Sequence, residues 1–329
     1  MSAPRPGIWP GIWIAVPGVI ALIVFGAYVV VWNQSAQAMR KAVAAWTEDV
    51  REQGGAASFG EFKATGFPFF LRGAITAVSI GGGGWAWTAP RLFIDASPFE
   101  PDRLIFSAPD PHEIRLTSGG RWRVDAPDGR ASLAKDESRG WLLDVQSGPG
   151  RIEAIGGASS ISARTFLLSA APNPLDRSRV FFGVDARGIE AVQGERRISI
   201  DAAEIALAVG NLGGARSLRA WRDTGGKVEV QRLRLEAAGA PAEFSGQLIL
   251  DPDGYPAGTL KAEIVNPAPI AEILGAAGVI AKDDIASATA ALSLAALAGG
   301  GRIAAPLTLE ERAAHVAGVR LGKLPQVLK

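Results

Sequence analysis

The sequence contains no cysteine, which excludes disulfide bonds, thiolate nucleophiles, iron–sulfur clusters, cysteine-ligated zinc and a lipid-modified N-terminal cysteine. It has only two histidines, His112 and His315, and neither has a second histidine at metal-ligand spacing. It also lacks an excess of one charge, since 34 basic and 33 acidic residues give a net charge of +1. Nucleic-acid binding normally requires a basic face. We therefore expect no cofactor, no metal site and no nucleic-acid partner.

Catalytic motifs are missing as well. No Gly-x-Ser-x-Gly nucleophile elbow occurs, and the glycine run 81–84 is not followed by the Lys-Ser/Thr of a phosphate-binding loop. Asp251 and Asp253 lack the terminal glutamate of a calcium loop. His112 and Glu113 are adjacent, and adjacent strand residues point to opposite faces, which weakens an acid/base pair. We expect no catalytic residue and no enzyme; a non-standard carboxylate site is the alternative.

The longest apolar run in the chain lies close to its start. Residues 8–32 contain no charge, and a bilayer core needs about 20 apolar helical residues. Aromatic rings favour the headgroup level. The membrane-anchor residues expected near the two ends of the run are Trp9, Trp13, Tyr28 and Trp32. The sequence predicts a transmembrane helix over residues 11–32.

Two questions about this segment stay open in the sequence. Ala36-Gln37-Ala38 matches the small-x-small pattern of a cleaved signal peptide, although the apolar run exceeds the ~7–15 residues of a signal core. The charge bias that sets the orientation is nearly balanced, because Arg5 and the amino terminus on one side face Arg40 and Lys41 on the other. We expect a bacterial inner-membrane protein, with residues 1–10 cytoplasmic and the bulk of the chain periplasmic.

The remainder of the chain reads as strands with a few helices. Apolar residues recur at helical spacing through 33–55, which predicts an amphipathic connecting helix. From residue 56 onward, short runs of alternating apolar and polar residues, separated by glycine and proline, predict strands. The whole chain contains 40 glycines and 21 prolines. The clearest hairpin joins 243–250 to 259–265, and Asp251, Asp253, Gly254 and Pro256 are its turn residues. A single strand is expected over 161–169, and two helices over about 269–298.

The fold class expected is mainly β with a few helices (α+β). An N-terminal transmembrane helix precedes an elongated, curved antiparallel sheet that forms one periplasmic domain over 56–329, with two helices near the C-terminus. A curved sheet with one apolar concave side could shield acyl chains. The aromatic residues proposed for such a groove are Phe67, Phe69, Trp85, Trp87, Phe106 and Trp122. The alternative for each is an ordinary core position.

Several short motifs occur in a familiar order. They are Gly66-Phe67-Pro68-Phe69; Trp87-Thr88-Ala89-Pro90 followed by Pro98 and Pro101; Ser245-Gly246-Gln247-Leu248; Asp253-Gly254-Tyr255-Pro256-Ala257-Gly258; Pro306-Leu307-Thr308-Leu309; and Gly318-Val319-Arg320-Leu321-Gly322. The chain resembles a family of Gram-negative, single-span proteins known only as a domain of unknown function. It departs from that pattern at Glu310-Glu311-Arg312, which stands where an Asp-Gly turn is expected.

That family is in turn distantly similar to the AsmA-like envelope proteins. This similarity implies an inner-membrane helix, a periplasmic β-rich groove and a part in phospholipid traffic or outer-membrane homeostasis. We therefore expect a non-enzymatic protein that binds lipid acyl chains or assists envelope lipid transport, with phospholipid and envelope proteins as partners. The alternative is a structural or interaction protein of an envelope assembly that carries no ligand.

Overall fold

The structure is a computed structural model that describes residues 10–97, 100–117, 119–212, 217–276, 285–316, 319–324 and 326–328. It begins with one long helix, α1 (Pro10–Glu52). At 1.5 Å per residue its 43 residues extend about 65 Å. The segments expected separately at 11–32 and 33–55 form one continuous helix, which ends at Glu52. Trp9, Pro98 and Gly318, and the expected cytoplasmic segment before Pro10, lie outside the described residues.

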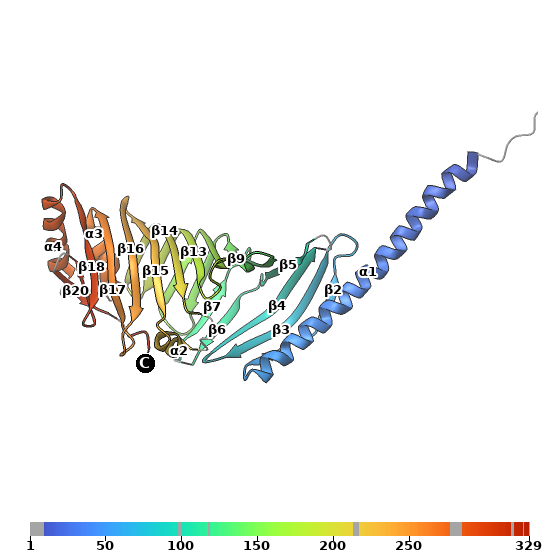
Figure 1. Cartoon of the computed structure of the whole chain (residues 1–329), viewed down its shortest axis with the longest axis horizontal. Helices are drawn as coiled ribbons and strands as arrows, with labels where there is room; N and C mark the ends of the chain where they lie inside the picture. The colour runs from blue at the N-terminus through green and yellow to red at the C-terminus, as the bar shows by residue number, and fades with distance from the viewer. Residues whose placement is uncertain are drawn as a thin grey trace, which may run out of the picture.

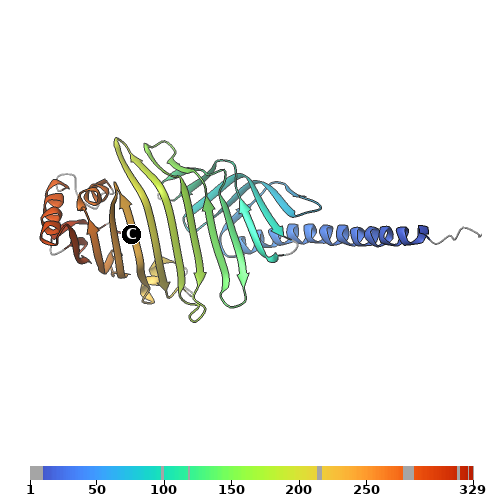
Figure 2. The same cartoon turned by 90° about the horizontal axis from the view of Figure 1, so that it is seen from above.

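An antiparallel sheet follows, and the described residues form 20 strands of it. Figures 1 and 2 show these strands succeeding one another from α1 toward the C-terminus and bowing around one concave side. The strands are β1 (Ala56–Ser58), β2 (Phe62–Thr65), β3 (Leu71–Gly82), β4 (Trp85–Ser97), β5 (Glu100–Ser107), β6 (His112–Leu116), β7 (Arg121–Asp125), β8 (Arg130–Asp136), β9 (Gly140–Ser147), β10 (Gly150–Ala154), β11 (Ser159–Ala163), β12 (Thr165–Pro172), β13 (Val180–Gln193), β14 (Arg196–Gly210), β15 (Lys227–Ala237), β16 (Ala240–Leu250), β17 (Pro256–Val265), β18 (Arg302–Glu310), β19 (Ala313–Val316) and β20 (Val319–Lys323). The expected fold class is confirmed.

A crease runs across the first half of this sheet. β4 pairs with β5 along one part of its length and with β6 along the other, and β13 pairs in the same divided way with β12 and β11. Between β4 and β13, the pairs β5/β6, β7/β8, β9/β10 and β11/β12 are each one long strand interrupted near its middle. The interruptions fall at residues 108–111, 126–129, 148–149 and 164.

Proline and glycine explain most of these breaks. Proline lacks the N–H that a ladder hydrogen bond needs, and glycine weakens a strand interior. Pro109 and Pro111 occupy the first break, Pro127 and Gly129 the second, and Pro149 the third. The breaks are neighbours in the sheet, since Ser107 pairs with Arg130 and Arg130 pairs with Gln146. Because the breaks are aligned, the sheet can bend along one line.

The strand expected over 161–169 is two strands, β11 and β12, which are divided at Arg164.

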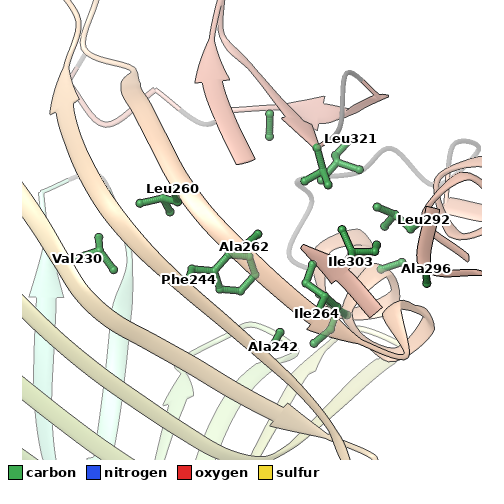
Figure 3. Packing of buried hydrophobic residues seen from close by; sticks show 14 residues of the cluster. Val230, Ala242, Phe244, Leu260, Ala262, Ile264, Leu292, Ala296, Ile303 and Leu321 are labelled. Atoms are coloured by element: carbon green, nitrogen blue, oxygen red, sulfur yellow. The ribbon is translucent and has the colours of Figure 1, made fainter. Parts of the chain in front are cut away.

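The far end of the sheet is closed by a packed core. α3 (Pro267–Ala276) and α4 (Ile285–Ala298) lie against β16 to β20, as expected for two helices near 269–298. Figure 3 shows Leu292 and Ala296 of α4 facing Ile303 and Leu321. Ile264 and Phe244 continue this core along the sheet. The expected capping residues of the second helix, Asp283 and Asp284, lie outside the described residues.

A short helix that the sequence did not predict, α2 (Leu218–Asp223), packs at the C-terminal end of β14. Ser217 caps it, since its hydroxyl accepts a hydrogen bond from the N–H of Ala220 at 3.1 Å. Trp221 is buried and donates its indole N–H to the carbonyl of Gly210 at 2.7 Å. Ser217 was the one local signal of this helix, because six residues are too few to show a hydrophobic period.

Two hairpin turns bear on the expected motifs. Asp251 accepts hydrogen bonds from Gly254 N through its carbonyl and from Tyr255 N through its carboxylate, so residues 251–255 close the hairpin of β16 and β17. β18 and β19 also form a hairpin without an Asp-Gly turn. Glu311 and Arg312 take φ values of 50° and 61° there. A type I′ hairpin turn needs positive φ at both central positions, and these two residues adopt it.

Candidate apolar lipid site

A large cavity lies between α1 and the creased part of the sheet. Its volume is about 1290 Å³, which exceeds the roughly 300–1,000 Å³ common for small-molecule sites. Its sheet wall is mainly aliphatic. The sheet residues that line it include Ile75, Val78, Ile80, Leu92, Ile94, Leu104, Val124, Leu133, Val145, Ile152, Ile161 and Phe166. An elongated, branched or chain-like apolar molecule is the ligand class that such a wall fits.

One face of α1 forms the other wall. Met39, Val43 and Trp46 line the cavity, and their spacing of three to four residues places them on one side of the helix. Met39 and Val43 also pack against Phe62 and the apolar residues of β3 and β4. Tyr28 and Trp32 line the cavity nearer the N-terminus of the helix. The wall therefore reaches into the last turns of the uncharged run.

Glycine at position 73 lets the helix approach the sheet. A Cβ atom at Gly73 would lie 2.8 Å from the Phe62 ring and 2.9 Å from the Met39 sulfur. Both distances are shorter than carbon and sulfur atoms tolerate without displacement. The close contact between α1 and β3 depends on the missing side chain.

The apolar face of the cavity continues along the rest of the sheet. Cross-strand partners share a face, so rows of partners trace it from strand to strand. One row, from the cavity to the C-terminal core, is Phe166, Ala186, Ala203, Leu235, Ala242, Ile264 and Ile303. A second is Leu168, Val184, Ile205, Leu233, Phe244, Ala262 and Ala305. We call this continuous concave face the trough.

Charged side chains collect on the opposite face. Arg187 contacts Asp185 and Glu204 at 2.9 and 3.0 Å, and Lys261 contacts Glu263 at 2.6 Å. The hydrogen bond and charge of Glu263 raise the pKa of Lys261. These exposed pairs contribute little stability each. Their position leaves the trough without a row of charges and keeps the outer face in water.

Polar side chains line part of the cavity, among them Arg130, Gln146 and Arg151, and Arg151 forms an ion pair with Glu153 at 3.2 Å. His112 lines the cavity with its ring against Trp87, at 5.8 Å between centroids, and Glu113 pairs with Arg121 at 3.1 Å on the other face. Arg91 forms two hydrogen bonds to Asp110, at 2.6 and 2.7 Å, which lower the pKa of that carboxyl. The Ser147 hydroxyl is buried in the wall and has no hydrogen-bond partner among the described residues. The described residues contain no group of three or more His, Asp or Glu side chains placed to hold a metal ion.

The structure divides the six aromatic residues expected in a groove. Trp87 and Phe106 line the cavity. Trp85 and Trp122 share a face with Trp87 and Val124 by strand alternation, and they lie outside the cavity lining, toward the strand ends.

Phe67 and Phe69 do not line the cavity. They belong to the turn 66–70 between β2 and β3, which contacts the side of α1. Most of the lining is aliphatic and was not singled out from the sequence. Strand alternation could have identified these residues as one apolar face of the sheet. It does not show which apolar faces are left uncovered by other elements of the fold.

The expected anchor residues are placed on α1 as far as they are described. Tyr28 and Trp32 stand at the end of the uncharged run beside the turn 66–70. The backbone of Trp13 lies in the helix, and Trp9 is outside the described residues. α1 is long and apolar enough to cross a bilayer and fits either a membrane anchor or a signal sequence.

Comparisons with known proteins yielded one match. A family model described as "Uncharacterized protein conserved in bacteria (DUF2125)" matches residues 32–325. No curated protein and no solved structure matched the chain.

Proposed function

The chain belongs to this uncharacterised bacterial family, DUF2125, and we propose that it is a periplasmic lipid-binding protein anchored in the inner membrane by α1. In this proposal the trough accepts the acyl chains of membrane lipids, and the protein performs no chemical reaction. The likeness to AsmA-like envelope proteins, expected from the sequence, is part of the proposal. So is a role in envelope lipid transport or homeostasis.

One observation carries the proposal: an apolar cavity is walled on one side by the helix that ends the uncharged run. Tyr28, Val31 and Trp32 belong both to that helix end and to the cavity lining. A bilayer that surrounds residues 10–32 would end at this level, since about 20 helical residues span its core. The cavity would then adjoin the outer leaflet of the inner membrane.

The energetics favour acyl chains as ligands. Moving a methylene group from water into an apolar site contributes about 0.8 kcal/mol. Transfer between a bilayer and an apolar trough changes this term little, because both surroundings are apolar. The trough therefore lowers the free-energy cost of moving an acyl chain out of the membrane. Without the trough, the chain would have to enter water.

The continuous trough suggests a direction of movement. Its apolar rows connect the cavity beside α1 with the core under α3 and α4. A chain that enters beside Trp32 would meet apolar side chains at each successive strand. The core at the far end is filled by Leu292 and Ile303, so onward transfer would need a partner or a movement of α4.

The location is part of the same proposal. The sheet domain lies on the side of the span that carries Arg40 and Lys41, and Arg5 and the amino terminus precede the span. This charge bias is small, and the proposal places residues 1–10 in the cytoplasm. Proteins of the cell envelope are proposed as partners that receive or supply the lipid.

The proposal is tested with two matched substitutions in the full-length protein. Ile161 on β11 lines the cavity and is 49% exposed; Leu167 on β12, which continues the same interrupted strand, is 45% exposed and faces outward. Each is replaced by lysine, and the phospholipid that remains after gel filtration is measured by mass spectrometry. Lipid held around α1 is common to both variants, so their difference reports on the trough.

We expect Ile161→Lys to lose most of the trough-bound phospholipid, because a lysine charge is costly among apolar groups. Leu167→Lys should match the wild type. Equal lipid content in all three proteins would contradict the proposal and favour the alternative, an assembly protein without a ligand. Crosslinking to neighbouring envelope proteins would then be the next experiment.

A further inference from the structure

A charge-free turn with three phenylalanines lies beside α1 where the uncharged run ends. Residues 66–70 have the sequence Gly-Phe-Pro-Phe-Phe and connect β2 to β3. Phe69 is 81% exposed, although large apolar side chains gain free energy by leaving water. We call residues 66–70 the aromatic turn.

The aromatic turn is fastened to the membrane-level part of α1. The Phe67 ring contacts Phe25, Tyr28 and Trp32, with centroids 6.0, 6.1 and 5.5 Å apart. The hydroxyl of Tyr28 donates a hydrogen bond to the carbonyl of Pro68, and the indole N–H of Trp32 donates one to the carbonyl of Phe70 at 3.2 Å. The turn and the helix therefore hold a fixed relative position.

That position sets the depth of the turn. Phe25 precedes Trp32 by seven residues, which is about 10 Å along a helix. Tryptophan and tyrosine favour the headgroup level, and a phenylalanine in the middle of an apolar run lies among acyl chains. A turn that contacts Phe25 on one side and Trp32 on the other spans both levels.

From this geometry we infer that the aromatic turn inserts into the bilayer leaflet from which α1 emerges, as a second membrane contact of the domain. Phe69 is the residue that enters the lipid. The charged neighbour Arg72 is bonded to Asp95 at 2.6 and 2.7 Å, which neutralises its charge, and its guanidinium lies 5.4 Å from the Phe70 ring and 5.0 Å from the Phe93 ring. The inference requires α1 to be the span and does not require lipid in the trough.

The absence of cysteine makes a direct test possible. Phe69→Cys gives the full-length protein a single thiol, which is labelled with an environment-sensitive fluorophore. The control is Leu175→Cys, at a residue that is 96% exposed in the connection between β12 and β13. Both proteins are reconstituted into vesicles of phosphatidylethanolamine and phosphatidylglycerol, with and without bromine on the acyl chains.

We expect the label at position 69 to emit at shorter wavelength and to be quenched by the brominated chains. The label at position 175 should respond to neither change and should be quenched by aqueous iodide. A label at position 69 that iodide reaches as readily as position 175, or equal quenching of both by brominated lipid, would overturn the inference. Insertion at position 69 in a protein whose trough holds no lipid would leave this inference intact and contradict the proposed function alone.

Discussion

The indole N–H of Trp32 donates a hydrogen bond to the carbonyl of Phe70, 38 residues away in the sequence, at 3.2 Å. Trp32 belongs to α1, and Phe70 immediately precedes β3. The bond therefore joins the helix that leaves the uncharged run to the first long strand of the sheet.

Replacing Trp32 by phenylalanine removes this donor and keeps an aromatic ring. A typical hydrogen bond contributes about 1 kcal/mol net. We expect amide hydrogen exchange of residues 66–71 to accelerate by roughly fivefold in the full-length protein. Trp141→Phe on β9 serves as the control and should leave exchange in the aromatic turn unchanged. Unaltered exchange in Trp32→Phe would mean that the bond does not hold the turn.

Gly73→Val tests the close approach of α1 to the sheet. The new side chain would collide with Phe62 and Met39, and overpacking of this kind costs about 1–3 kcal/mol. The melting temperature should fall by several degrees, since about 1 kcal/mol shifts it by roughly 2–4 °C in a domain of this size. Gly210→Val is the control, because the nearest atom to its Cβ is the Lys227 carbonyl oxygen at 3.9 Å. Equal melting temperatures for the two variants would contradict the packing described.

Two leucines of α4 test the closed end of the trough. Leu292 is 2% exposed in the C-terminal core and Leu297 is 74% exposed on the same helix. Leu292→Ala should destabilise the protein by about 2–5 kcal/mol through the lost contacts and the cavity left behind. Leu297→Ala should change stability by less than about 0.5 kcal/mol. Thermal unfolding in detergent separates the two, and comparable losses would show that α4 packs differently.

The turn between β8 and β9 predicts a pH dependence. Hydrogen bonds from the Ser138 hydroxyl and from the N–H groups of Arg139 and Ser138 lower the pKa of Asp136 from its usual 3.8. A lowered folded-state pKa gives stability that is present above 3.8 and is lost as the pH falls through the folded value. The stability difference between wild type and Asp136→Asn should thus be constant from pH 7 to about pH 4 and shrink below it. A difference that grows on acidification would contradict this sign, and Glu137→Gln in the same turn is the control.

Much of the architecture followed from local patterns. The length and lack of charge of residues 8–32 predicted the apolar helix. Alternating apolar residues on both sides of Asp251 and Gly254 predicted the hairpin of β16 and β17. The crease was harder to predict. Pro109, Pro127 and Pro149 each mark a break in the sequence, but only the strand register shows that the breaks are neighbours.

Only part of the candidate site could be predicted, because contacts between distant segments are not visible in local sequence patterns. Trp87 and Phe106 were identified as groove residues because aromatic side chains are conspicuous, whereas Leu133 and Ile161 look like ordinary core positions. Phe67 was misplaced because turn residues carry no strand period, and its contact with Phe25 joins segments 42 residues apart. Long-range packing of this kind leaves no trace in a local pattern.

The central claim, that the trough holds acyl chains, is tested most directly by photocrosslinking in a living Gram-negative cell. Cells that express the full-length protein are fed a fatty acid with a diazirine on its chain, illuminated, and the modified residues are mapped by mass spectrometry. We predict adducts on cavity residues of β8 to β12, such as Leu133 and Ile161, in addition to those on α1. Adducts confined to α1 and the aromatic turn would contradict the claim, because lipid would then contact the protein only within the membrane.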